Sequence, residues 1–188
     1  MGDPFDFQAL WVLQPGHLPA NRAKYQIFNG DRELLANAAD TERRSLMSLP
    51  GKSMKDLAVL EIVTAAGDPL LTMIRQHTEW NTELRNPAGA VVGHIRTGDT
   101  RRTYKLVDET GETVAKVTGD LGLKRFSVTA AGGGKLAQVK KTRAGIFKEM
   151  LTSNDHYKVE FIGPVPQPVR MLIAMVPIVL DLTLYEPL

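Results

Sequence analysis

Apolar residues recur at a fixed spacing along the middle of the chain. Four glycines stand 22 residues apart, at Gly67, Gly89, Gly111 and Gly133. When the sequence is aligned on them, apolar columns stand five residues before and three and six residues after each glycine. The column five residues before holds Ile62, Leu84, Leu106 and Val128. A unit with a central glycine turn, flanked by short segments rich in Val, Thr, Ile and Tyr, is typical of a β-hairpin. The columns three and six residues after the glycine differ in parity, which predicts a β-bulge there.

An earlier hairpin is predicted around Asn29-Gly30, because Asn-Gly is a strong two-residue turn signal. Single strands are predicted near Ala9–Leu13 and Tyr157–Phe161, which brings the total to about twelve. A sheet of that size tends to curl and close, and closure removes its unpaired edges. We therefore predict a mainly β fold, a closed antiparallel barrel of about twelve strands.

The only long apolar run comes last, from Val169 to Leu184. Ten residues, Met171 to Leu180, are uninterrupted by charge, whereas a membrane-spanning helix needs about 20. A barrel of this girth has an interior that must be filled. We expect this segment to be a buried hydrophobic helix filling the barrel; a membrane anchor is the alternative. The prediction is a single domain over residues 1–188, with strands at about 8–162 and the central helix at about 168–184.

Composition narrows the class of protein. The chain is 43% hydrophobic and 23% charged, which is ordinary for a globular protein, and it has no cysteine. Disulfides, thiolate metal sites, a cysteine nucleophile and palmitoylation are therefore excluded. The first ten residues include Asp3 and Asp6 and show no signal-peptide pattern, so a cytoplasmic location is expected. No nucleophile elbow, phosphate loop or metal-ligand histidine spacing is present, and we predict a protein that is not an enzyme.

Charge is unevenly distributed along the chain. Residues 96–148 contain 12 basic and 5 acidic residues, an excess that favours an anionic partner or a solvated barrel exterior. The candidate ligand-binding residues are the basic pairs and their neighbour: Arg101, Arg102, Lys124, Arg125, Lys140, Lys141 and Arg143. The first two pairs recur at about the same point of the repeat, so they are expected along one end of a barrel.

Three stretches resemble a known family. They are Leu10–Gln14 with Tyr25–Phe28, then Gly145–Glu149 with Thr152–Asp155 and Tyr157–Phe161, and finally Val179–Glu186. They are similar to phospholipid scramblases and LURP-one-related proteins of the tubby-like barrel superfamily, in a bacterial-type form. The resemblance implies the helix-filled barrel, a role at phospholipid membranes and, from tubby domains, lipid head-group binding through basic residues.

Scramblases are described as calcium-dependent movers of phospholipids, and the resemblance places their acidic segment at residues 153–160. Only Asp155 and Glu160 carry carboxylates there, while calcium takes six to eight oxygen ligands. We therefore expect no resident cofactor, with Asp155 as the remaining calcium candidate, and we count scrambling as doubtful.

Two functions remain open at this point. The first is a scramblase-related, non-catalytic protein at the membrane periphery that binds anionic phospholipid head groups. The alternative is a cytosolic scaffold that binds protein or nucleic acid with the same barrel. Nucleic acid is the weaker partner, because aromatic residues make up only 6% of the chain and offer no stacking platform.

Overall fold

The computed structural model describes residues 5–14, 23–40, 57–76, 80–142 and 156–184. Twelve strands and one helix follow one another in these ranges. They are β1 (Ala9–Leu13), β2 (Ala23–Asn29), β3 (Leu34–Asp40), β4 (Leu57–Thr64), β5 (Pro69–Gln76), β6 (Asn81–Arg85), β7 (Val91–Thr97), β8 (Thr103–Asp108), β9 (Thr113–Gly119), β10 (Arg125–Ala130), β11 (Lys135–Thr142), β12 (His156–Phe161) and α1 (Val169–Leu184).

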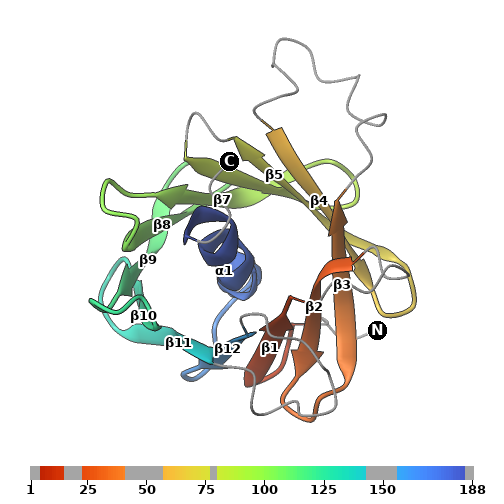
Figure 1. Cartoon of the computed structure of the whole chain (residues 1–188). Helices are drawn as coiled ribbons and strands as arrows, with labels where there is room; N and C mark the ends of the chain where they lie inside the picture. The colour runs from red at the N-terminus through yellow and green to blue at the C-terminus, as the bar shows by residue number, and fades with distance from the viewer. Residues whose placement is uncertain (1–4, 15–22, 41–56, 77–79, 143–155, 185–188) are drawn as a thin grey trace.

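Each strand pairs antiparallel with its neighbours in sequence, and β1 pairs with β12 to close the barrel. Figure 1 shows the ring of strands with α1 in its centre. The predicted mainly β, twelve-stranded closed barrel around a C-terminal helix is confirmed. Because neighbouring strands run in opposite directions, the barrel has two distinct ends. The hairpin end carries the five tight turns, and the loop end carries the connections between one hairpin and the next.

The repeated glycines lie in the hairpin turns, as predicted. Gly67, Gly89, Gly111 and Gly133 have φ angles of 92°, 83°, 91° and 92°, a region that glycine adopts at little cost. The first hairpin differs from the prediction. Its left-handed residue is Arg32, with φ of 69°, while Gly30 has no positive φ.

A β-bulge follows each of the four glycine turns. Strand register shifts in β5, β7, β9 and β11 at the residue three positions after the glycine. These residues are Leu70, Val92, Val114 and Leu136, and all four pack against the core while remaining partly exposed. The bulge therefore explains why the apolar columns three and six residues after the glycine differ in parity.

The core forms between the inner faces of the strands and α1. Ile62, Leu84, Leu106 and Val128, the column five residues before each glycine, are all at most 1% exposed. From Leu172 to Thr183 every helix residue is buried, and the helix continues through Pro177. No helix in the described part of the chain is long and apolar enough to cross a membrane.

Polar contacts anchor α1 at both ends. At the hairpin end, the buried Arg170 guanidinium donates to the carbonyl of Phe5 at 2.7 Å and to that of Phe7, and it lies 4.0 Å from the centre of the Phe161 ring. Near the loop end, the Tyr25 hydroxyl donates to the buried Asp181 carboxylate at 2.8 Å. Arg170 and Asp181 interrupt the apolar pattern because they tie the helix to the wall.

Candidate functional site: a basic arc at the loop end

The basic pairs singled out from the sequence lie on adjacent connections at the loop end. Arg101 and Arg102 precede β8, and Lys124 with Arg125 stands where β10 begins. The backbone joins these connections, because Gly119 N–H donates to the Arg102 carbonyl at 2.7 Å. Lys141 N–H likewise donates to the Lys124 carbonyl at 2.8 Å. The described members, Arg101, Arg102, Lys124, Arg125, Lys140 and Lys141, thus follow one another around the rim, and we call them the basic arc.

Four cations of the basic arc have no ion pair within 4 Å to an acidic side chain of the described ranges: Arg101, Arg102, Lys124 and Arg125. All but Arg102 are exposed. Arg102 is half-buried, and its buried Nε has no hydrogen-bond partner among the described residues. A buried donor left unsatisfied costs about 1–3 kcal/mol, so an acceptor reaching this nitrogen would recover energy.

Asp120 organises the turn that carries Lys124 and Arg125. Its Oδ1 accepts the backbone N–H of Lys124 at 2.9 Å and that of Arg125 at 3.3 Å. The hydrogen bond from the Lys124 backbone, followed by that from Arg125, lowers the pKa of the Asp120 carboxyl. Attraction to the nearby Arg125 charge lowers this pKa as well. The Asp120 carboxylate thus holds the backbone of Lys124 and Arg125 in a fixed turn.

Lys140 differs from these four cations. Its Nζ lies 2.8 Å from a Glu160 oxygen, and Lys158 Nζ lies 2.7 Å from the other oxygen. The hydrogen bonds from Lys140 and then Lys158 lower the pKa of Glu160. Lys141 lies with its Nζ 6.0 Å from the centre of the Tyr157 ring. Arg143 lies outside the described residues.

Sequence reasoning missed a second group of cations, on the outer wall beside the basic arc. Lys105 on β8 pairs directly with Arg96 on β7 and with Lys116 on β9. All three are exposed. Like charges directly opposite one another on a sheet are destabilising. The signal was present in the repeat, because Lys105 stands at the polar position just before an apolar column, but the register was needed to bring the three together.

The proposed calcium candidate receives no support from the described residues. Asp155 lies outside them, and the Glu160 carboxylate is engaged by two lysines. Within the described ranges, no group of three or more His, Cys, Asp or Glu side chains could hold a metal ion.

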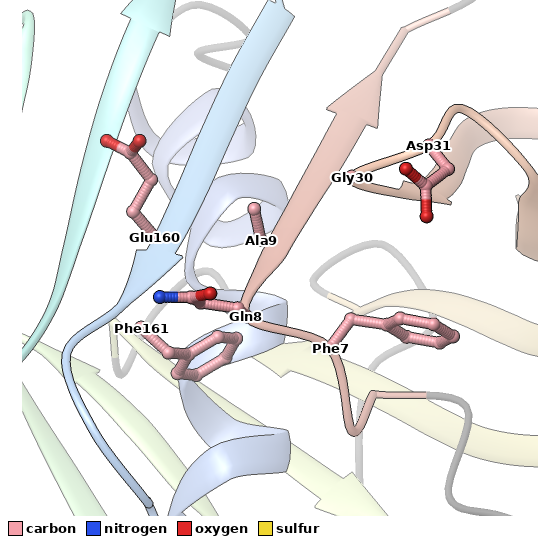
Figure 2. Close-up of a pocket in the computed structure, with 7 residues that line it drawn as sticks. All are labelled: Phe7, Gln8, Ala9, Gly30, Asp31, Glu160 and Phe161. Atoms are coloured by element: carbon pink, nitrogen blue, oxygen red, sulfur yellow. The ribbon is translucent and has the colours of Figure 1, made fainter.

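An open hollow of about 480 Å³ lies at the hairpin end, near the start of β1. Its lining consists of Phe7, Gln8, Ala9, Gly30, Asp31, Glu160 and Phe161. In Figure 2, the Gln8 and Phe161 side chains lie close together, whereas Asp31 and Glu160 lie on opposite sides of β1. The two carboxylates do not converge, and we therefore place the candidate site at the basic arc.

A closed antiparallel barrel threaded by a hydrophobic helix is the architecture of the tubby-like barrel class. More specifically, the chain belongs to the Scramblase family, whose family model matches residues 20–187. A crystal structure of an Arabidopsis thaliana protein is similar, with a TM-score of 0.57 and 14% identity. That match covers 95% of this chain and 94% of the plant chain, and at this identity it shows the fold alone. A search of curated proteins found no significant match.

Proposed function

We propose that the protein binds anionic phospholipid head groups at the cytoplasmic membrane periphery through the basic arc. The observation that carries this proposal is the run of four cations, Arg101, Arg102, Lys124 and Arg125, which form no ion pair within 4 Å to an acidic side chain of the described ranges. Membership of the Scramblase family points to a lipid-related function. Each Lys or Arg near an anionic bilayer contributes about 1 kcal/mol, so the four supply about 4 kcal/mol.

The wall cations strengthen the proposal. Arg96, Lys105 and Lys116 continue the basic surface from the rim onto β7–β9, where they face one another without acid between them. An anionic surface would offset the mutual repulsion of these three cations. Solubility alone does not require like charges to stand directly opposite one another on the sheet.

The proposal concerns binding rather than catalysis or lipid transport. Moving a head group through the barrel would require an open path, whereas the interior beside α1 is filled by fully buried side chains such as Leu84, Leu106 and Leu180. We therefore propose a non-catalytic protein without a resident cofactor, and we do not extend the proposal to scrambling.

The test is co-sedimentation with vesicles of phosphatidylcholine, with and without phosphatidylserine, in calcium and in chelator. We expect binding to the anionic vesicles only. Replacing Arg101, Arg102, Lys124 and Arg125 with Gln should weaken it by about 1000-fold, the equivalent of about 4 kcal/mol. A calcium requirement would return Asp155 to consideration as a ligand.

A matched pair of variants separates the basic arc from overall charge. Lys124→Gln with Arg125→Gln removes two exposed cations at the loop end, and Arg32→Gln with Lys135→Gln removes two at the hairpin end. Only the first should weaken vesicle binding. An equal loss of vesicle binding in the two double variants would indicate that overall positive charge, and not the basic arc, attracts the protein to the vesicles. Binding to duplex DNA but not to vesicles at equal salt would favour the scaffold alternative.

A further inference from the structure

We infer that Trp80 and Leu121 enter the bilayer interface, so that the barrel meets the membrane with its loop end. This inference rests on the proposed function, and it adds an apolar component and an orientation to the electrostatic attraction. Among the described residues, the large hydrophobic side chains that are exposed are Trp80, Leu121 and Ile162, at 41%, 87% and 48%. Two of these three lie at the loop end, beside the basic arc.

Leu121 occupies the tip of a turn that fixes its position. Leu123 N–H donates to the Asp120 carbonyl at 3.2 Å, and the Asp120 side chain accepts the backbone N–H groups that follow. Turn tips favour Gly, Asn, Asp, Pro and Ser, so the turn itself does not call for a leucine that is 87% exposed. Lys124 and Arg125 come three and four residues later, at the end of the same turn, so the apolar tip and the two cations share one short connection.

Trp80 directly precedes β6, and Leu121 lies between β9 and β10, so the Arg101–Arg102 pair that precedes β8 stands between them around the rim. The Arg101 guanidinium carbon is 4.9 Å from the centre of the Trp80 ring, a cation–π contact. Trp80 has φ of 50°, which is unusual for a bulky residue, and its carbonyl accepts Thr97 N–H at 2.8 Å. The rim thus holds a tryptophan in a specific place while leaving 41% of it exposed.

The order of side chains around the rim is apolar, basic, apolar, basic: Trp80, then Arg101 with Arg102, then Leu121, then Lys124 with Arg125. The backbone bond between Gly119 and Arg102 makes the two connections immediate neighbours. A bilayer fits this order of side chains. Lipid phosphates can bind the cations, while Trp80 and Leu121 reach the boundary between head groups and acyl chains. A nucleic acid or an acidic protein surface would take the cations and leave Leu121 without an apolar environment.

The experiment uses the intrinsic fluorescence of Trp80 and two matched substitutions. Trp11, the other tryptophan, is only 8% exposed, and Trp11→Phe leaves Trp80 as the sole reporter. On adding phosphatidylserine-containing vesicles, we expect the Trp80 emission to shift to the blue and to be quenched by lipids brominated near the head group. Leu121→Ser should weaken binding by about 10-fold, whereas Ile162→Ser at the hairpin end should leave it unchanged.

The outcomes separate this inference from the proposed function. If the wild type binds anionic vesicles, but Trp80 emission does not change and Leu121→Ser binds as the wild type does, attachment is purely electrostatic and the inference is wrong. If the wild type binds no vesicle, the proposed function fails and the inference fails with it. Unfolding midpoints of both serine variants should equal that of the wild type, because both side chains are exposed.

Discussion

The tightness of packing between α1 and β7 can be tested by adding a single methyl group at Gly93. A Cβ at position 93 would lie 2.4 Å from the Val107 carbonyl oxygen and 3.1 and 3.2 Å from the two Cδ atoms of Leu172. The nearest obstacle is backbone, held by the pairing of β7 with β8, and it cannot turn aside as the end of a side chain can. Gly93→Ala should therefore force β8 or the helix to move.

The size of the effect follows from these contacts. Overpacking a core costs about 1–3 kcal/mol, and we expect about 3 kcal/mol because the clash includes backbone. With a urea m-value of about 2 kcal/mol/M, the unfolding midpoint should fall by about 1.5 M. Gly111→Ala is the control, since its Cβ would meet nothing within 4 Å and only its φ of 91° is strained. That strain costs about 1 kcal/mol, a shift of about 0.5 M.

The assay is urea unfolding of the two variants and the wild type, followed by circular dichroism. A Gly93→Ala midpoint no lower than that of Gly111→Ala would refute the reasoning. It would mean that α1 and β8 can move by several tenths of an ångström without lowering the free energy of unfolding. The helix would then be loosely packed in the barrel.

Three further predictions concern buried polar groups and pH. Tyr25→Phe should lower the free energy of unfolding by about 2 kcal/mol in urea titrations, because it removes a hydrogen bond to the buried Asp181 carboxylate; an unchanged midpoint would contradict this. Glu160 has a lowered pKa, so its carboxylate stabilises the fold above its ordinary pKa of 4.5 and loses that effect as pH falls through the lower folded value. The stability advantage of the wild type over Glu160→Gln should accordingly shrink below pH 4.5 in unfolding curves measured across pH. Burial lowers the pKa of His94 from 6.5, so the unfolded chain binds the proton more tightly than the folded protein does. The wild type should therefore lose stability relative to His94→Gln as pH falls below 6.5. Plots of unfolding free energy against pH that run parallel for the two proteins would contradict this.

The fold could be predicted from the sequence because its repeat is regular. The glycine spacing located four turns, and the parity change at Leu70 and its three equivalents located the bulges. The first hairpin was only partly predictable. Asn-Gly marks the turn, but the Asn29 side chain accepts the backbone N–H groups of Asp31 and Glu33, and the left-handed conformation falls on Arg32.

The candidate site was less predictable, because it depends on which side chains meet across strands. The recurrence of the first two basic pairs in the repeat indicated a shared end. The pairing of Lys140 with Glu160, in contrast, depends on the register of β11 against β12. The same is true of the contact between Arg101 and Trp80, since the two residues come from different connections. Spacing along a chain does not reveal such neighbours.

The closure of the barrel by β1 and β12 has a consequence for biosynthesis. The first strand finds its second partner only when the last strand has been made, and α1 follows still later; Tyr25 and Asp181, for example, are 156 positions apart. Contacts this distant in sequence slow folding, and exposed apolar strands favour aggregation. During translation, the inner columns of leucine, isoleucine and valine therefore have no helix to cover them. The nascent chain should depend on chaperones until α1 leaves the ribosome.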